Sequence, residues 1–338
     1  MGNANAPRRR GWVVASVGSA LIVSSFLTGS PAAADETLDL DAVTDALQAV
    51  PDRYQVLEET PAAQAPADAI DFQPSQTVSQ ATQVPDSAAQ IETGSGTTLV
   101  IGVPFAEDAA PIGEVDGAVV FDNENGSYST VDPKDDGSVQ ITTLLTGPES
   151  PTEYVYDLAL PAGATGELVN GAVIYRDSGG NFLAGVAPAW AVDANGEPVP
   201  TSYELDGDQL VQMVQHSEET AYPVVADPWL GVDLWQATYY NRNGKYKNDL
   251  VVSALFSAWG WGTYTSRAGL GIMATAGWSE LVTKRPLVTG KSSLKHQYDC
   301  HVTFGYAWWW AGFHWDLEKA RANKSNWLGT ALDHRCNW

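Results

Sequence analysis

Charged and aromatic residues divide the chain near residue 228, and this division constrains the fold more than any other feature of the sequence. From residue 35 to 227 there are 34 acidic residues and only three basic ones, Arg53, Lys134 and Arg176. From residue 228 to 338 there are 12 basic and 7 acidic residues, with 11 of the 13 tryptophans and four of the 5 histidines. A net charge of −31 against one of +5 predicts two parts of different character.

The overall pI of 4.3 therefore describes neither part. Like-charge repulsion should keep the acidic part away from nucleic acid, so no nucleic-acid partner is expected. The basic part is suited to an anionic surface such as a wall polymer or lipid headgroups, although a charge of +5 is also ordinary for a domain of this size.

Residues 1–34 have the order of regions of a secretory signal peptide. Residues 8–10 are all arginine, residues 12–27 are uncharged and mostly apolar, and the alanines at 32–34 provide the small side chains of a cleavage site. We expect cleavage before Asp35 and a secreted, extracellular protein. Association with the cell wall is one form that this localisation could take. The alternatives are a retained anchor, for which the run is short, and twin-arginine export. After cleavage no transmembrane anchor is expected.

Cys300 and Cys336 are the only cysteines. In an exported protein an isolated pair predicts a disulfide bond, because the compartment is oxidising. The alternative is a nucleophilic cysteine with a histidine base, either Cys300 beside His301 or Cys336 near His334.

Residues 35–95 are expected to hold one short helix followed by a disordered linker. Leu40, Val43, Leu47 and Val50 recur at helical spacing before a proline. Residues 58–95 are rich in Ala, Pro, Gln, Ser and Asp, a composition that buries too little apolar surface to offset chain ordering.

Residues 96–227 predict a β-sandwich-like domain. Tyr154, Tyr156, Leu158 and Leu160 alternate with residues that face the other way, as in a half-buried strand. Residues 173–175 and 182–183 read as two strands about a glycine-rich turn. Many short strands at this spacing are typical of a sandwich. The acidic cluster at 132–136 is a calcium alternative, but it lacks the EF-hand order of ligands.

The end of this region contains Ala187-Pro188-Ala189-Trp190, Asp193-Ala194-Asn195-Gly196, Pro200-Thr201 and Tyr222-Pro223-Val224-Val225-Ala226-Asp227-Pro228. With these residues it resembles a module found in many exported actinobacterial proteins. That module usually precedes a variable C-terminal domain, so the resemblance implies a presenting role.

Residues 228–338 predict a small, tryptophan-rich α+β domain, which makes the whole chain multidomain: an all-β sandwich followed by an α+β domain with a disulfide. Residues 234–240 and 250–256 have the character of strands. Leu270, Ala274, Trp278 and Leu281 share one face of a helix that Pro286 must end.

The last 110 residues or so contain the motifs Trp278-Ser279-Glu280-Leu281, Gln297-x-x-Cys300-His301, Trp315-x-Leu317-Glu318-x-x-Arg321 and Cys336-Asn337. With these motifs the segment resembles the exported bacterial domain of unknown function DUF2599. The family usually has Pro after the Leu-Glu pair and Asn at the position of Asp316, and Lys319 and the 308–310 run also depart from it. The resemblance supports the domain boundary and the disulfide and implies no reaction.

His301 is the first catalytic candidate, with Asp299 and Glu318 as carboxylate partners. A histidine base oriented by a carboxylate would perform general acid–base catalysis, and the neighbouring disulfide would hold it rigid. The structural alternative is a buried hydrogen-bonded network in which Glu318 pairs with Arg321.

Trp308, Trp309 and Trp310, with Trp315 and Arg321, are the binding candidates. Three adjacent tryptophans cannot all face one core, so at least one is expected at the surface, where indoles stack on sugars or lie at lipid interfaces. The alternative is a loop whose rings cover the small core.

No cofactor or metal is expected. His314-x-Asp316-x-Glu318 could place three ligands on one face of a strand, but a helix would scatter them. Ser292-Ser293-Leu294-Lys295 matches an acyl-enzyme motif whose partner motifs are absent from the sequence.

The sequence leaves three functions open. The first is an envelope-associated protein that presents its disulfide-locked C-terminal domain to a wall polymer or envelope surface. The second is a small cell-wall hydrolase that uses His301 and a nearby carboxylate. The third is an exported antagonistic toxin, suggested by a presenting module ahead of a compact basic domain.

Overall fold

The middle of the chain forms short antiparallel strands, as its alternation of apolar and polar residues predicts. The computed structural model describes residues 38–58, 62–244, 248–266, 269–305 and 313–338. The expected signal peptide at 1–34 and the tryptophans at 308–310 lie outside the described residues. Among the described residues, no helix has the length and apolar character needed to cross a bilayer.

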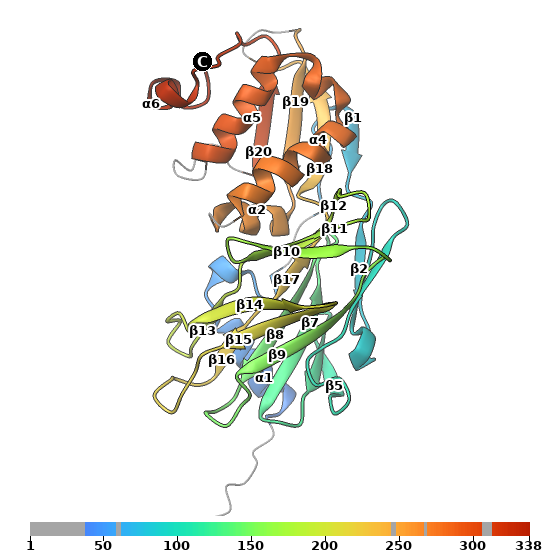
Figure 1. Ribbon diagram of the computed structural model, residues 1–338, viewed down its shortest axis with the longest axis vertical. Helices are drawn as coiled ribbons and strands as arrows, with labels where there is room; N and C mark the ends of the chain where they lie inside the picture. Colours follow the sequence, from blue (N-terminus) through green and yellow to red (C-terminus); the bar gives the residue numbers. More distant parts are fainter. Residues whose placement is uncertain (1–37, 59–61, 245–247, 267–268, 306–312) are drawn as a thin grey trace, which may run out of the picture. The chain divides into compact units, whose positions relative to one another are not determined.

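The largest sheet has ten strands in the order β10-β11-β12-β17-β8-β7-β6-β5, with β13 and β16 attached beside β8 (Figure 1). β8 is central, and all seven of its residues are buried because neighbours flank it and packed layers cover both faces. The strands are β5 (Ala110–Val115), β6 (Ala118–Asp122), β7 (Ser127–Pro133), β8 (Val139–Leu145), β10 (Thr165–Val169), β11 (Ala172–Arg176), β12 (Phe182–Val186), β13 (Ala191–Val192), β16 (Val224–Ala226) and β17 (Trp229–Gly231).

A second sheet has six strands in the order β14-β15-β9-β4-β3-β2. In β9 the predicted alternation is confirmed: Tyr154, Tyr156 and Leu158 are buried, and Glu153 and Asp157 are exposed. The strands are β2 (Val78–Ala81), β3 (Ala89–Glu92), β4 (Thr98–Ile101), β9 (Glu153–Ala159), β14 (Thr201–Asp206) and β15 (Gln209–Val214).

One apolar core contains residues from both sheets. Ile91 and Tyr156 contribute from the six-stranded sheet, and Phe121, Val131 and Ile141 contribute from the ten-stranded sheet. These side chains are at most 1% exposed, so burying them supplies the main free energy that holds the two sheets together.

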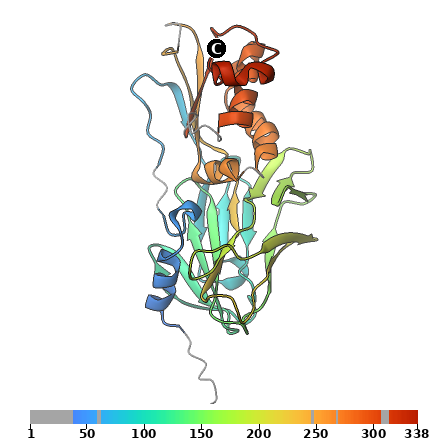
Figure 2. The same ribbon diagram turned by 90° about the vertical axis from the view of Figure 1, so that its left-hand side faces the viewer.

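The predicted N-terminal helix is confirmed as α1 (Leu40–Gln48), and it lies along the outside of the ten-stranded sheet (Figure 2). Asp39 begins the helix, because its carboxylate accepts a hydrogen bond from the amide of Ala42 at 2.9 Å. Val43 and Leu47 are buried against the sheet. The 3-10 helix η1 (Asp52–Tyr54) follows Pro51.

The prediction of a disordered linker at 58–95 is wrong for most of its length. The described part of this segment forms β1 (Ile70–Pro74), β2, the 3-10 helix η2 (Pro85–Ser87) and β3. Few large apolar residues are present, but Ala88, Ala89 and Ile91 are fully buried because β3 lies between β2 and β4. Sheet neighbours therefore provide the partners that composition alone does not reveal.

The C-terminal part contains a four-stranded sheet in the order β1-β18-β19-β20, with helices α4 and α5 across one face (Figure 1). The two predicted strands and the end of the helix before Pro286 are confirmed. The elements are β18 (Trp235–Asn241), β19 (Val251–Phe256), α2 (Ala258–Thr265), α3 (Leu270–Ile272), the π-helical turn η3 (Met273–Gly277), α4 (Trp278–Lys284), the 3-10 helix η4 (Pro286–Gly290), α5 (Ser292–Phe304), β20 (His314–Glu318), the 3-10 helix η6 (Leu328–Thr330) and α6 (Ala331–His334).

Trp259 of α2 joins this part to the ten-stranded sheet. Its indole packs against Gly185 and Gly231, and a Cβ atom on Gly231 would lie 2.3 Å from the ring. The indole N–H donates to the carbonyl of Trp229 at 3.1 Å. The two strands therefore need glycine where the ring lies against them.

The strands on either side of the expected boundary at residue 228 are interleaved. β17 follows the boundary but belongs to the ten-stranded sheet, whereas β1 precedes it by more than 150 residues and forms an edge of the four-stranded sheet. Leu38–Trp338 is one compact unit. A division into separate domains at residue 228 stays a prediction.

A buried arginine fixes β1 to its neighbour. Arg285 is fully buried, and its guanidinium donates to the Asp71 carboxylate at 2.6 Å and to the Thr238 hydroxyl at 2.9 Å. Its charge also lies 4.9 Å from the centre of the Tyr240 ring. The ion pair therefore joins residues that are 214 positions apart.

Asp71→Asn is expected to lower the free energy of unfolding by about 2 kcal/mol, because the buried guanidinium loses its carboxylate. The loss of a fully buried partner costs about 3–5 kcal/mol, and the 56% exposure of the Asp71 side chain reduces this cost. Urea unfolding measures the change, with Glu107→Gln as an exposed control. Equal midpoints for the two variants would contradict the expected role of the ion pair.

Candidate functional site

The motif Gln297-x-x-Cys300-His301 lies on α5, and the predicted disulfide between Cys300 and Cys336 is present. Both sulfurs belong to buried residues, at 0% and 3% exposure. The Gln297 amide donates to the carbonyl of Glu318 at 3.0 Å and accepts from its N–H at 2.8 Å. Gln297 thus provides hydrogen-bond partners for the backbone N–H and carbonyl of Glu318 at the end of β20. Cys300 attaches the C-terminal tail to α5 through the disulfide.

His301 is 9% exposed, and its ring stacks on Trp315 with 5.2 Å between the centroids. Burial and, to a smaller extent, the nearby positive charge of Arg321 lower the pKa of His301 to about 4. The imidazole is therefore neutral at physiological pH and belongs to a packed aromatic cluster.

The other two catalytic candidates have partners elsewhere. Asp299 pairs with Lys295 one turn earlier on α5, and Glu318 pairs with Arg321. Within the described residues, the His301 ring makes no hydrogen bond to Asp299 or Glu318. The structure thus places His301 near the end of β20 but joins none of the three side chains into an acid–base pair. A catalytic role for them stays a prediction.

The binding candidates that the structure describes lie inside the fold. Trp315 is 1% exposed in the aromatic core. Arg321 is 8% exposed, and its guanidinium donates to Asn337 and to the carbonyl of Trp338. These contacts stabilise the tail, whereas the expected surface indoles at 308–310 lie outside the described residues.

The segment 314–318 is the strand β20, so His314 and Asp316 share its outward face. His314 Nε2 lies 3.2 Å from Asp316 Oδ1 and 2.9 Å from the Tyr239 hydroxyl, and Ser253 donates to Asp316 at 2.5 Å. Within the described part of the chain, no three His, Cys, Asp or Glu side chains are arranged to hold a metal ion.

At 132–136, the segment considered for calcium binding, two carboxylates already have partners within the protein. Asp132 pairs with Lys134 at 2.5 Å. Asp136 is 3% exposed, and it accepts hydrogen bonds from Ser138 and from the amide of Trp259. Asp136 therefore joins the sheet to α2, and Asp132 is paired with Lys134 beside it.

A cleft of about 900 Å³ lies between α4 and three β segments. Residues 72–77 form one wall, the hairpins at 93–97 and 177–183 contribute further walls, and residues 232–233 with α4 complete it. Its size falls within the range of small-ligand sites in proteins.

Asp233, Glu280 and Lys284 form a charged cluster in this cleft. Lys284 Nζ donates to Asp233 Oδ1 at 2.9 Å, to Glu280 Oε1 at 2.6 Å and to the carbonyl of Trp235 at 3.2 Å. Asp233 also accepts from Ser75 at 2.5 Å and from Thr77 at 2.6 Å.

The backbone amides of Leu234 and Trp235 donate to Glu280 at 2.8 and 3.2 Å. The cluster thus joins α4 to the start of β18, and Asp233 also bonds to Ser75 and Thr77 of the 72–77 wall. These hydrogen bonds and ion pairs fix the walls of the cleft in the absence of a ligand.

In this cluster, burial favours the neutral form of each group, whereas attraction between opposite charges favours the charged form. Burial raises the pKa of Glu280 to about 7, although Lys284 acts to lower it. For Asp233, burial is outweighed by Lys284 and the two hydroxyls, which lower the pKa of that carboxyl. Burial is likewise outweighed at Lys284, whose pKa is raised by both carboxylates. Asp233 and Lys284 stay charged at neutral pH, and Glu280 titrates there.

Sequence reasoning missed this cluster. Glu280 appeared only within the Trp278–Leu281 resemblance, and Asp233 lies 47 positions earlier in the sequence. The i,i+4 spacing of Glu280 and Lys284 on a predicted helix was the one available signal, and it indicates an ordinary surface pair unless burial is known.

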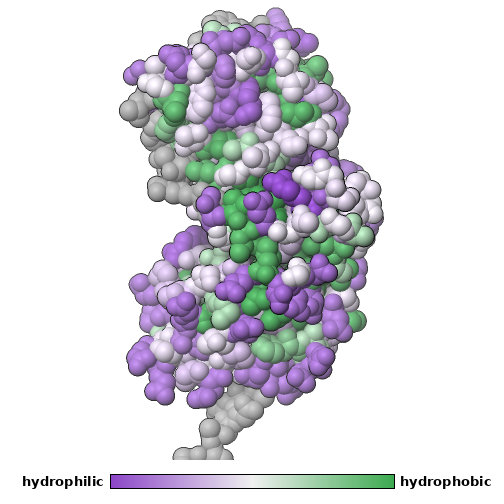
Figure 3. All heavy atoms as spheres, viewed as in Figure 1, coloured by the Kyte–Doolittle hydropathy of each residue, from purple (hydrophilic) through white to green (hydrophobic). Residues whose placement is uncertain are grey.

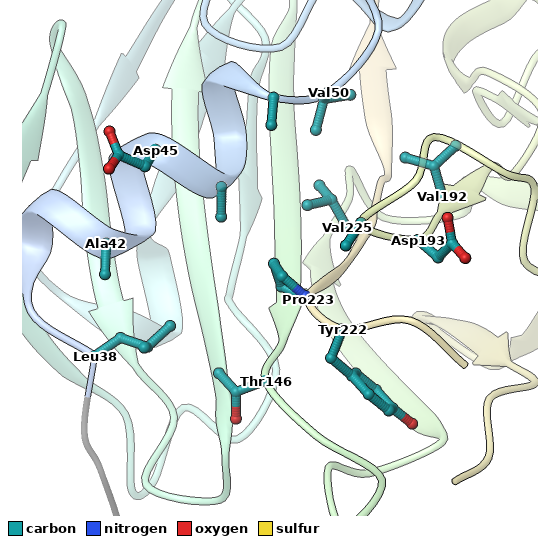
Figure 4. A pocket seen from close by; sticks show the side chains of 13 residues that line it. Leu38, Ala42, Asp45, Val50, Thr146, Val192, Asp193, Tyr222, Pro223 and Val225 are labelled. Carbon is teal, nitrogen blue, oxygen red and sulfur yellow. The ribbon is translucent and has the colours of Figure 1, made fainter. Parts of the chain in front are cut away.

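A smaller cavity of about 440 Å³ lies between α1 and the segments at 192–194 and 222–225 (Figure 4). Most of its lining residues are apolar, among them Ala42 and Ala46 of α1 together with Val192, Pro223 and Val225. Asp45 and Asp193 also belong to the lining. The larger cleft offers many more polar groups and is the candidate site.

Comparison with known proteins does not guide this choice, because no family model, no curated protein and no solved structure matches the chain. The resemblance of the last 110 residues or so to DUF2599 stays a prediction, and function is argued from the cleft.

Proposed function

We propose that the protein is an exported binding protein of the cell envelope and that the cleft holds a wall polymer. The observation that carries this proposal is the cleft itself, whose walls come from segments far apart in the chain and are joined by the Asp233–Glu280–Lys284 cluster. A site with preset walls spends little binding free energy on ordering.

In this proposal the two large sheets form a β-sandwich that presents the C-terminal part to the envelope. The disulfide favours an oxidising compartment outside the cytoplasm. The face in Figure 3 is mostly polar, and hydrophobic residues gather mainly across the middle of the described unit. A polar surface suits a protein that stays soluble until it meets its ligand.

A sedimentation assay with isolated cell walls tests the proposal. The oxidised chain from Leu38 to Trp338 is mixed with the walls and centrifuged, and protein is measured in both fractions. Thr283→Trp should fill the cleft and weaken pelleting by about tenfold or more.

Thr303→Trp is the matched control. Both threonines are exposed on helices and donate to the carbonyl four residues earlier, at 2.9 Å for Thr283 and 2.8 Å for Thr303, but Thr303 lies outside the cleft. Selective loss with Thr283→Trp supports the proposal. Absence of pelleting, equal behaviour of both variants, or release of soluble wall fragments would overturn it.

A further inference from the structure

We propose that the ligand of the cleft is an uncharged, hydroxyl-rich glycan. This inference rests on the proposed function, because it names the kind of envelope polymer that the same cleft would bind.

Neutral hydrogen-bonding groups dominate the accessible lining of the cleft. Six of its exposed side chains end in a hydroxyl or an amide, and they come from four separate segments: Gln73, Gln76, Ser95, Asn181, Ser279 and Thr283. Hydroxyls and amides both donate and accept, so they match sugar hydroxyls without requiring a charge.

The charges in the cleft disfavour an anionic ligand. Among the described residues, Asp177, Asp233 and Glu280 line it, and Lys284 is the one cation. The ammonium has three N–H donors, and Asp233, Glu280 and the carbonyl of Trp235 already accept them. A phosphate or carboxylate polymer would therefore meet excess negative charge and no free ammonium. The basic net charge of residues 228–338 does not extend to this site.

A cationic ligand gains little from the same carboxylates. Asp233 accepts from Ser75, Thr77 and Lys284, and Glu280 accepts from two backbone amides and Lys284. Asp177 accepts from the amides of Gly179 and Asn181 at 2.8 Å within its own turn. Because these oxygens are engaged, an uncharged ligand fits the lining best.

Two aromatic rings complete the site. Phe72 and Phe182 line the cleft from different segments, and both are half-buried. Phe182 stacks on Trp259 with 6.3 Å between centroids, and Phe72 packs near Tyr239 at 6.0 Å. Rings held in this way offer apolar surface to the C–H faces of sugar units at low entropic cost.

The wall at 72–77 links ligand binding to β1. Ser75 and Thr77 hold this segment to Asp233, and residues 70–74 pair with β18. A glycan that contacts Phe72 and Gln73 should therefore slow amide exchange across 70–77, because it binds only when the segment is in place.

The test uses three oligosaccharides of equal length: a neutral β-linked N-acetylglucosamine oligomer, its de-N-acetylated cationic form and an anionic galacturonate oligomer. Calorimetry gives the affinity for the oxidised 38–338 chain, and hydrogen exchange gives the protection of residues 70–77. The neutral oligomer should bind most tightly. Its affinity should change by less than about twofold between about 0.05 and 0.5 M salt, because screening acts on charges.

A gain-of-charge variant sharpens the test. Ser279→Lys adds an ammonium to the cleft and should raise the affinity for the anionic oligomer severalfold, whereas Thr303→Lys should not. Tightest binding of either charged oligomer by the wild-type chain would overturn the inference.

The two proposals fail separately. Wall pelleting that Thr283→Trp abolishes, without binding of the neutral oligomer, would overturn the glycan assignment and leave the envelope function standing. Binding of the neutral oligomer with protection of 70–77, but no wall pelleting, would support the glycan site and overturn the envelope function.

Discussion

Asp227→Asn is expected to remove much of the decline in stability between pH 4 and pH 8. Asp227 is fully buried at the end of β16, where Trp190 donates to its carboxyl at 2.9 Å and Gln212 donates at 3.1 Å. The Tyr203 hydroxyl acts to lower the pKa of this carboxyl but does not outweigh its burial, and no cation among the described residues pairs with it. Burial raises the pKa of Asp227 to about 8, against an ordinary value of 3.8.

The direction of the effect follows from proton linkage. The folded chain keeps a proton on Asp227 up to about pH 8, whereas the unfolded chain releases it near pH 4. Between these values the native state binds more protons, so the free energy of unfolding falls as pH rises. A shift of this size corresponds to about 5 kcal/mol over the whole interval.

The measurement is urea unfolding of the wild type and Asp227→Asn at pH values from about 4.5 to 8.5. Glu280 contributes in the same direction up to about pH 7, so the difference between the two curves isolates Asp227. Asp206→Asn, at an exposed position at the end of β14, should leave the slope unchanged. Parallel curves for wild type and Asp227→Asn would show that the buried carboxyl is ionised throughout.

Local sequence patterns predicted the elements whose signals lie within a few residues. The alternation of tyrosines and leucines at 154–160 predicted β9, and Pro286 marked the end of α4. The lone cysteine pair predicted the disulfide because only one pairing exists. The Tyr222–Pro228 stretch was singled out by a resemblance that stays a prediction, and nothing in its sequence indicated that Asp227 is fully buried and bonded to Trp190 and Gln212.

Long-range contacts account for what the sequence did not reveal. β1 and β2 expose most of their polar side chains and become strands because β18 and β3 pair with them. The cleft likewise depends on the meeting of Ser75, Asp233 and Glu280, which lie on segments far apart in the sequence. Burial changes the interpretation of a charged pair such as Glu280 and Lys284. The sequence indicates a solvated surface pair, whereas the structure shows a buried pair that helps to form the wall of a site.

Removal of the Cys300–Cys336 disulfide is expected to lower the free energy of unfolding by about 4 kcal/mol. The cross-link joins residues 36 positions apart, and in the chain-entropy model a loop of this length restricts the unfolded chain by that amount. Guanidinium unfolding of the oxidised protein, the reduced protein and Cys300→Ala/Cys336→Ala measures the effect. If the cross-link is the cause, reduction and double substitution should have similar effects.

The loss of order should begin in the tail rather than in the helices of the C-terminal part. Leu294 and Tyr298 of α5 remain buried in the aromatic core without the disulfide. Among the described residues, the tail would keep the contacts of Arg321 with Asn337 and Trp338, the bond from the Trp338 indole to the carbonyl of Ala322 at 2.8 Å, and apolar packing near Phe304. Hydrogen exchange should therefore quicken at 328–338 while 292–304 stays protected. Equal stability of the oxidised and reduced proteins, or simultaneous exchange of both segments, would mean that these contacts hold the tail and the disulfide does not.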